Sequence, residues 1–405
     1  MHLSTASLAL LAVSFASGAN AASTVKCAST SDCSAAKGFA TPANAKAGCN
    51  KARGVCVFSC NTGYTLSTSG TSCVSTSSPA TTTKAAVVVT TTSSSRPATA
   101  TAPNATPVLK ETYSGQGFLD KMNFWTAADP THGQVNYVSA ASAKSLGLTQ
   151  VTKSGTVLLS IDRTSKLAQG QNRNSVRLSS KAAYQPGQLI IADLKHAPVG
   201  CSVWGAYWLY NYPWPQSGEI DIYEGVNLGT KNSYTLHTAP GCTRSGSLTG
   251  STAGYPTDCN AGNANSGCTV SDPSSSSFGA GFNAAGGGVF ALLYAETGIS
   301  IWRWPRASIP SDVKSGKPRW KGWGTPVAQW SGTTCDTRTF FANQLITFDI
   351  TTCGDWAGQQ SVWQSTAASG KCYSSKYPTC SAAVADPANF KEAYFEVNYV
   401  KVFSV

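Results

Sequence analysis

The sequence predicts an all-β protein in which one large sandwich follows a small cysteine-rich module and a linker. From about residue 109 onwards, short runs of aliphatic and β-branched residues alternate with turns rich in Gly, Ser, Asn and Pro. Residues 157–161, 188–192 and 289–293 are examples of these runs. No long segment with the helical period of 3.6 residues competes with them. About 300 residues of this pattern are typical of a single large β-sandwich.

Residues 1–21 have the pattern of a signal peptide. An apolar stretch over residues 8–16 precedes Ala19-Asn20-Ala21, which fits the small-residue rule for cleavage. The positively charged start of such peptides is missing, since only His2 stands there. The stretch is too short to cross a bilayer, and no other segment is long and apolar enough. We therefore expect a secreted protein, extracellular or associated with a cell wall, without a membrane span.

Residues 22–73 are expected to form a small module stabilised by disulfides. Six of the fourteen cysteines lie in it: Cys27, Cys33, Cys49, Cys56, Cys60 and Cys73. The segment has few large apolar residues, so disulfides rather than a core would hold it together. Six cysteines allow fifteen pairings, and the sequence does not choose among them. The sequence also leaves open whether the module binds a cell wall or a partner, or is only a spacer held together by disulfides.

Residues 74–107 are a linker of Thr, Ser, Ala and Pro, a composition that cannot bury a core and is expected to be disordered. The main domain is then expected to span residues 108–405. It holds the other eight cysteines, and we expect Cys259 to pair with Cys268 and Cys372 with Cys380, because each pair is close in the sequence.

The composition excludes several classes of function. The net charge is +11, but no basic run or basic helix concentrates it, so we expect no binding to nucleic acid. Four His, two Met and no Cys/His zinc spacing argue against a metal-centred function, and we expect no metal at the site and no required cofactor. Neither a GxSxG nor an HExxH motif is present, which removes two common hydrolase classes. We expect a monomer.

The most informative segment is 218–225, which reads Gly-Glu-Ile-Asp-Ile-Tyr-Glu-Gly. It concentrates three acidic residues in a chain that is only 12% charged. The acids alternate with residues that favour strands, so the carboxylates are expected to crowd along one strand. Such crowding costs stability and is typical of sites that need paired carboxylates, as glycosidic cleavage does.

The spacing of these acids predicts a bulged strand. Glu219 and Asp221 are two residues apart and share a face of a regular strand. Glu224 follows them by five and three residues, both odd numbers, so a regular strand would turn it to the opposite face. One β-bulge between Asp221 and Glu224 brings all three acids to one face. We expect that face to be concave, with Ile220 and Ile222 turned into the core.

Aromatic residues precede the acidic strand, and sugar rings stack on aromatic planes. For Trp204 and Trp208 the sequence leaves open whether they wall a cleft or fill the core. Trp214 lies between Pro213 and Pro215, where burial in a regular core is harder, and a role in the cleft is favoured. His237 lies in the alternating segment 234–238, which would place it beside the acids if that strand pairs with theirs.

The domain resembles glycoside hydrolase family 16, and within it the fungal endo-1,3(4)-β-glucanases, or laminarinases. The acidic segment looks like the bulged form of that family's signature, and other stretches follow in the family's order. These are Asn136-Tyr137-Val138-Ser139, Asn174-Ser175-Val176-Arg177, Leu236-His237-Thr238, Phe278-Gly279-Ala280-Gly281-Phe282-Asn283, Pro305-Arg306-Ala307-Ser308-Ile309-Pro310 and Cys353-Gly354-Asp355-Trp356-Ala357-Gly358. The resemblance covers residues 109–405 and does not extend to the first two segments.

The resemblance implies a β-jelly-roll with a concave cleft for β-glucan and a retaining mechanism. In it Glu219 is the nucleophile, Glu224 the general acid/base and Asp221 the helper between them. Three further positions match residues that the family places near the bound sugar: Asn136, Arg177 and His237. The family sometimes binds a structural calcium away from the cleft, although no ligand cluster for one is visible in this sequence.

Two alternatives to hydrolysis stay open. A transglycosylase uses the same acids but passes the glucan to a sugar hydroxyl. A non-catalytic β-glucan-binding protein on the same sandwich usually lacks one or both glutamates, and both are present here. The sequence also leaves open whether the preferred glucan is pure β-1,3, branched β-1,3/1,6 or mixed β-1,3/1,4.

Overall fold

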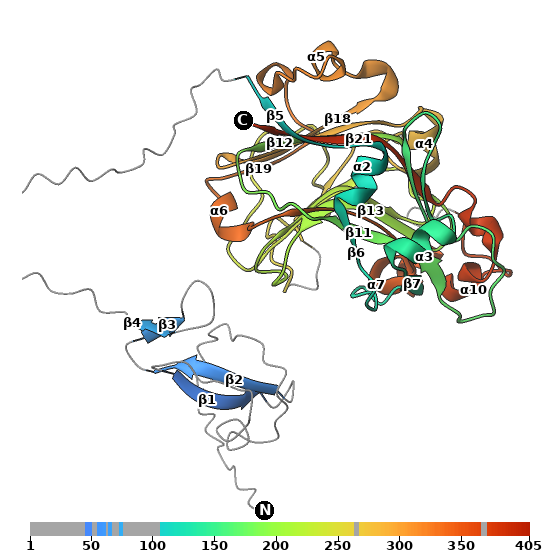
Figure 1. Ribbon diagram of the computed structural model, residues 1–405, viewed down its shortest axis with the longest axis horizontal. Helices are drawn as coiled ribbons and strands as arrows, with labels where there is room; N and C mark the ends of the chain where they lie inside the picture. Colours follow the sequence, from blue (N-terminus) through green and yellow to red (C-terminus); the bar gives the residue numbers. More distant parts are fainter. Residues whose placement is uncertain are drawn as a thin grey trace, which may run out of the picture. The chain divides into compact units, whose positions relative to one another are not determined.

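The computed structural model describes residues 45–50, 55–61, 64–66, 73–75, 106–262, 267–365 and 371–405. The chain divides into two units, residues 1–96 and 97–405 (Figure 1). The predicted signal peptide and almost all of the predicted linker lie outside the described residues.

The described part of the first unit consists of two short antiparallel pairs. β1 (Ala45–Asn50) pairs with β2 (Val55–Cys60), and β3 (Tyr64–Leu66) pairs with β4 (Cys73–Ser75). Two-stranded pairs of this size are marginal alone, in keeping with a module that has little core of its own.

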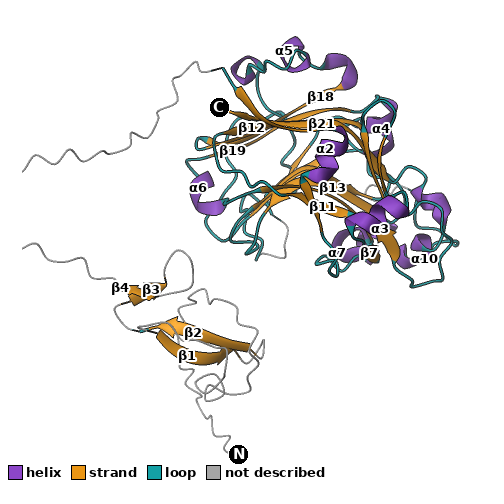
Figure 2. Cartoon of the chain, viewed as in Figure 1, coloured by secondary structure: helices purple, strands orange, loops and turns teal. Residues whose placement is uncertain are grey.

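The second unit is the predicted sandwich, a jelly-roll of two large antiparallel sheets (Figure 2). The sheet that carries the acidic segment has seven strands. In spatial order they are β16 (Val270–Ser271), β15 (Ser233–His237), β14 (Glu219–Val226), β13 (Val203–Tyr210), β20 (Leu345–Thr352), β11 (Arg177–Ser180) and β6 (Met122–Phe124).

The second sheet has eight strands, seven in its main path and one that pairs at the side. In spatial order they are β19 (Ala328–Ser331), β18 (Gly298–Pro305), β17 (Gly288–Ala295), β12 (Gln188–His196), β21 (Tyr394–Ser404), β9 (Val157–Ser160) and β8 (Thr149–Val151), with β5 (Val108–Tyr113) beside β21. A short parallel pair, β7 (Val135–Tyr137) with β10 (Arg173–Ser175), lies outside both sheets.

The helices are short and lie in the connections between strands. They are α2 (Gly115–Asp120), α3 (Ala140–Ser145), α4 (Gly279–Ala284), α5 (Ser311–Lys314), α6 (Thr337–Phe340), α7 (Gly354–Ala357), α8 (Gln360–Gln364) and α10 (Cys380–Val384), with 3₁₀ turns η1 (Arg306–Ser308), η2 (Trp320–Gly322) and η3 (Pro387–Phe390). None of the helices in the described ranges is long and apolar enough to cross a membrane.

The main core lies between the two sheets and follows the alternation of the strands. On β13 and β14 the inward residues include Tyr207, Leu209, Ile220 and Ile222, all fully buried. The prediction that Ile220 and Ile222 turn into the core is therefore confirmed. On the facing sheet, inward residues of β12 and β17 complete the same core. Burial of this apolar surface is the main term that stabilises the sandwich.

Four disulfides join parts of the described second unit. Cys259 pairs with Cys268, as predicted from their closeness. The predicted pair Cys372–Cys380 is wrong: Cys372 bonds to Cys201, 171 residues away, and Cys380 bonds to Cys353. Both bridges lie in one buried cluster around Trp363. Packing in this cluster decides which cysteines pair, and distance along the sequence does not reveal it. The fourth bridge joins Cys242 to Cys335.

Candidate active site

The acidic segment forms β14, and the strand carries the predicted bulge. Against β13 the register runs from Tyr210↔Glu219 to Trp208↔Asp221, then shifts by one residue so that Tyr207 faces Tyr223. Ile222 is therefore the extra residue on β14. The shift returns Glu224 to the face that carries Glu219 and Asp221. At the start of the strand Gly218 has φ +72, and a Cβ there would lie 2.4 Å from the Phe340 carbonyl, so the position requires glycine.

A buried asparagine satisfies two backbone groups of β14 that lie beyond its pairing with β15. β15 pairs with β14 only from Glu219 to Asp221. Beyond that point the Asn232 side chain takes the place of a strand: its Oδ1 accepts from the Glu224 backbone N–H at 2.9 Å, and its Nδ2 donates to the Ile222 carbonyl at 2.8 Å. Asn232 is fully buried, so the side chain fixes both the bulge and the position of Glu224.

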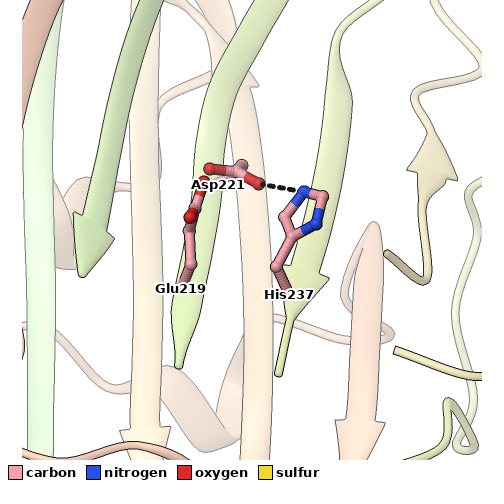
Figure 3. A group of neighbouring side chains, drawn as sticks. All are labelled: Glu219, Asp221 and His237. Atoms are coloured by element: carbon pink, nitrogen blue, oxygen red, sulfur yellow. Dashed lines mark ion pairs between the residues drawn. The ribbon is translucent and has the colours of Figure 1, made fainter. Parts of the chain in front are cut away.

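Two of the three acids, Glu219 and Asp221, meet His237 at the other edge of β14. Glu219 faces His237 directly in the β14–β15 register, which confirms that the two strands pair. The His237 Nε2 lies 3.5 Å from the Asp221 Oδ2 (Figure 3). Figure 3 also shows Glu219 and Asp221 on one strand and the imidazole reaching toward them from the next. The face of the sheet therefore groups two carboxylates and an imidazole.

A cleft of about 740 Å³ opens over this face of the seven-stranded sheet. Its size is within the range of small-molecule and oligomer sites. Glu219 and Glu224 both line it. The other lining residues come from strands β11, β13 and β15 and from the connecting segments around them: Arg177, Trp204, Trp208, Tyr210, Tyr212, Trp214, Ser233, Thr235, His237, Thr269, Pro130, Thr131, Gly254, Tyr255, Pro256, Asp355, Trp356 and Gln359.

All three predicted tryptophans line the cleft, and each indole N–H donates to a carboxylate. Trp204 donates to the Glu224 Oε1 at 2.9 Å, Trp208 to the Asp349 Oδ1 at 2.7 Å, and Trp214 to the Glu219 Oε2. The sequence left the location of Trp204 and Trp208 open, and the structure places both in the cleft. The indoles thus serve two purposes, because they present apolar rings to the cleft and orient the acids at its floor.

Arg177 lines the cleft from β11, which is separated from β14 by β13 and β20. Its guanidinium carbon is 4.9 Å from the Trp208 ring centre, 5.1 Å from that of Tyr210 and 5.3 Å from that of Trp125. Across the strands Arg177 faces Asp349, whose Oδ2 also accepts from the Tyr137 hydroxyl at 3.2 Å. Arg177 is the one lysine or arginine among the described residues that line the cleft.

Among the predicted sugar-binding residues, Asn136 is the one that the structure does not bring to the cleft. It lies exposed on β7, outside both large sheets, and its Oδ1 accepts from the Asn172 side chain at 3.3 Å. It is not among the residues that line the cleft. The strand pair that carries it is parallel and peripheral, a placement that the motif alone does not indicate.

The titration of the acids is shifted by their surroundings. Burial raises the pKa of Glu224 to about 8, the Trp204 hydrogen bond opposes this, and the charges of Glu219 and Asp349 add to it. Burial raises the pKa of Asp221 well above its usual range, as do the nearby charges of Glu219 and Glu224. Burial lowers the pKa of His237. Glu224 is therefore protonated at neutral pH, as a general acid must be.

Two residues that sequence reasoning missed hold the site in place. Asp349 is buried on β20 and joins Trp208, Tyr137 and Arg177, and burial raises its pKa to about 6. The alternation of Thr347, Asp349 and Thr351 with apolar residues was a signal for a strand with one polar buried face. Asn232 gave no such signal, because its role depends on the bulge.

Comparison with known proteins agrees with this geometry. A family model described as the XgeA-like catalytic domain of glycoside hydrolase family 16 matches residues 122–403. The endo-1,3(4)-β-glucanase of Arthroderma benhamiae is 41% identical over 313 residues, which are 76% of this chain and 66% of that protein. A probable endo-1,3(4)-β-glucanase of Aspergillus fumigatus is 41% identical over 300 residues, 73% of this chain and 45% of that protein. The chain thus spans less than half the length of this second relative.

Two solved structures are similar over 74% of this chain and the whole of theirs. An elongating family 16 β-1,3-glucosyltransferase is 38% identical with a TM-score of 0.68. Laminarinase 16A from Phanerochaete chrysosporium is 36% identical with a TM-score of 0.67, and that structure holds β-glucans (6-O-glucosyl-laminaritriose) in donor and acceptor sites. The jelly-roll, the bulged acidic strand and the match over residues 122–403 lead to one conclusion. The chain belongs to glycoside hydrolase family 16.

Proposed function

We propose that the protein is an endo-acting β-glucanase that hydrolyses internal β-1,3-glucosidic bonds with net retention. The observation that carries the proposal is the pair of glutamates on one bulged strand, both lining the cleft, with Glu224 held protonated at neutral pH. A protonated and an unprotonated carboxyl group facing one bond are what glycosidic cleavage requires.

The proposed reaction has two steps. Glu219 attacks the anomeric carbon while Glu224 gives its proton to the departing glycosidic oxygen, and a glycosyl-enzyme forms on Glu219. Glu224, now ionised, takes a proton from water, which attacks the anomeric carbon and releases Glu219. Asp221, packed between Glu219 and His237, orients the nucleophile, and its raised pKa lets it share a proton with Glu219.

The cleft walls support a polymeric sugar as substrate. Trp204, Trp208 and Trp214 offer ring faces on which pyranoses stack, and their N–H groups are already used by the acids. Arg177 and His237 supply polar contacts at the floor. The relatives' names include endo-1,3(4)-β-glucanase, and β-1,4 bonds in mixed-linkage glucan are part of the proposal on that ground. Four disulfides in the described residues are compatible with the proposed secretion.

A product profile tests this proposal. The protein is incubated with laminarin, a branched β-1,3/1,6-glucan and a mixed-linkage β-1,3/1,4-glucan, and the products are sized over time. We expect a rapid fall in chain length with short oligosaccharides appearing, and the β-anomer as the first product in the NMR spectrum. An α-anomer as first product excludes retention, and release of single glucose units from chain ends excludes endo action.

Transglycosylation is the second candidate, because a similar solved structure is described as an elongating β-1,3-glucosyltransferase. The same glycosyl-enzyme would then be attacked by a sugar hydroxyl instead of water. Products longer than the starting oligosaccharide, at millimolar laminari-oligosaccharide, would favour transfer. Products that are only shorter at every substrate concentration would favour hydrolysis.

A further inference from the structure

The acid cluster at the floor of the cleft is rich in carboxyl groups and poor in cations. Glu219 and Glu224 line the cleft, and Asp221 is buried on the same strand. Arg177 is the sole lysine or arginine among the described cleft-lining residues, and it faces Asp349 rather than Glu219. A cation bound beside His237 would supply the positive charge that these carboxyl groups lack.

The geometry near His237 fits a small metal ion. Glu219, Asp221 and His237 each offer one ligand atom, and these three atoms lie within 4.8 Å of one another. The residues come from adjacent paired strands, with Glu219 directly opposite His237, so the backbone holds the three side chains together (Figure 3). Ligands about 2 Å from a central ion lie roughly 3–4 Å apart, so a small contraction suffices.

A second observation points to a ligand at this place. Asp221 is 1% exposed, and its Oδ2 has no hydrogen-bond partner although it points toward the imidazole. Buried polar atoms without partners are rare and costly. The unpaired Asp221 Oδ2, next to the His237 Nε2, is therefore coordination capacity that the protein itself leaves unused.

We propose that Glu219, Asp221 and His237 form a binding site for one borderline divalent cation, of which Zn²⁺ is the type, and that the bound ion blocks the cleft. One imidazole and two carboxylates match the ligand preference of Zn²⁺. Mg²⁺ and Ca²⁺ prefer six or more oxygens and do not suit a site with one nitrogen and three protein ligands. A bound ion engages the Glu219 carboxylate, which can then no longer attack the substrate, so the ion acts as an inhibitor and not as a cofactor.

Calorimetry on the full chain tests the site without reference to catalysis. ZnCl₂ is titrated into the protein in a non-coordinating buffer, and we expect one saturable site that MgCl₂ and CaCl₂ do not fill. His237→Gln removes the nitrogen ligand and should weaken zinc binding by on the order of tenfold or more. His132→Gln is the matched control, because His132 is an exposed imidazole beside a single carboxylate, Asp355. Equal zinc affinity in the His237 variant and the wild type overturns the proposal.

Glu219→Gln guards against a folding defect in the His237 variant. It removes one anionic ligand without changing the shape of the side chain, and zinc affinity should fall in it as well. Circular dichroism and thermal unfolding show whether each variant is folded. Unchanged zinc affinity in a folded Glu219→Gln protein contradicts the assigned ligands.

The consequence for activity rests on the proposed function and is measured separately. In the wild type, zinc at a concentration that saturates the calorimetric site should abolish release of reducing ends from laminarin, and EDTA should restore it. If metal-free protein cleaves no glucan, the proposed function fails while the calorimetric result stands. If zinc binds and glucan cleavage continues, the block of the cleft is wrong.

Discussion

The two large sheets of the sandwich use buried residues in opposite ways. In the eight-stranded sheet, β17 is apolar on both faces: Leu292 and its neighbours fill the core, while Leu293 packs outward against the segment that contains α5 and η2. In the seven-stranded sheet the outward face is mixed: on β13 it buries Ala206, Trp208 and Tyr210. The outward face buries Asp221, Asp349 and Arg177.

The difference separates stability from function. Burying apolar residues on both faces stabilises the fold at about 25 cal/mol for each Å² removed from water. Burying carboxyl groups costs free energy, and here it also shifts pKa values in the direction that acid catalysis needs. The eight-stranded sheet therefore mainly stabilises the fold, and the seven-stranded sheet contains the buried charges that the chemistry needs, at a cost in stability. Substitutions in the two sheets should consequently affect different measurements.

The largest expected effect on activity is at Glu219. Glu219→Gln removes the proposed nucleophile and keeps the shape of the side chain, so glucan cleavage should fall by at least about a thousandfold. Thermal unfolding should change little, because the variant removes a charge from a crowded acidic face. Release of reducing ends from laminarin measures activity, with Glu111→Gln, whose carboxylate pairs with Lys121, as control. Substantial activity in a folded Glu219→Gln protein breaks the assignment.

The largest expected effect on stability is in the other sheet. Leu292→Ala removes a fully buried side chain from the core and leaves a cavity, so the free energy of unfolding should fall by about 2–5 kcal/mol. Urea unfolding measures it. Leu146→Ala is the matched control, since Leu146 is 52% exposed and its loss should cost less than about 0.5 kcal/mol. A drop in activity of the folded Leu292 variant as large as that of Glu219→Gln would remove the contrast between the sheets.

Asn232 couples the two properties and should affect both. Asn232→Ala leaves the Glu224 N–H and the Ile222 carbonyl without their partner, at a cost of about 1–3 kcal/mol for each group that water does not reach. Because the same groups fix the bulge, activity measured on folded protein should fall as well. Asn136→Ala, an exposed asparagine outside the cleft, should change stability little. An Asn232 variant that is destabilised but fully active would show that the bulge holds without this side chain.

The sequence predicted the elements whose signal is local. The odd spacing from Glu219 to Glu224 required a bulge, and the register contains it at Ile222. The nearby cysteines Cys259 and Cys268 pair as expected. Alternation placed His237 on the next strand along the chain and beside the acids if the two strands pair, and the register shows that they do.

Long-range features were not predictable in the same way. The partner of Cys372 is 171 residues away at Cys201, and only the packed cluster around Trp363 brings them together. Asp349 lies more than a hundred residues from the acidic strand and reaches the floor of the cleft because β20 pairs with β13. Sheet order decides such contacts, and a single sequence contains no direct record of sheet order.

Replacing Trp204 should shift the pH dependence of activity toward higher pH. Its indole N–H donates to the Glu224 Oε1 and stabilises the ionised form, which lowers the pKa of Glu224 from the value that burial alone would set. In Trp204→Phe that bond is lost, so Glu224 stays protonated to higher pH. The alkaline limb of kcat/KM, expected near pH 8 in the wild type, should move up by about one pH unit or less. Trp356→Phe, which alters the ring packed edge-on against Trp204, is the control. A limb that moves down contradicts the prediction.

Replacing Asp349 should move the same alkaline limb in the opposite direction and by a smaller amount. Its pKa is about 6, so it is ionised where Glu224 titrates, and its negative charge helps to raise the pKa of Glu224. Asp349→Asn removes the charge, while the amide oxygen can still accept from Trp208. Glu224 and Asp349 lie opposite Ala206 on the strands to either side of β13, roughly 10 Å apart at two strand spacings. At that distance one charge shifts the pKa of the other group by roughly half a pH unit. The alkaline limb should therefore move to lower pH. Asp355→Asn, an exposed carboxylate at the rim, should leave it unchanged. If Asp349→Asn lowers kcat/KM equally at every pH, Asp349 only positions Trp208 and Arg177, and the buried charges of this sheet act through geometry rather than through the field at Glu224.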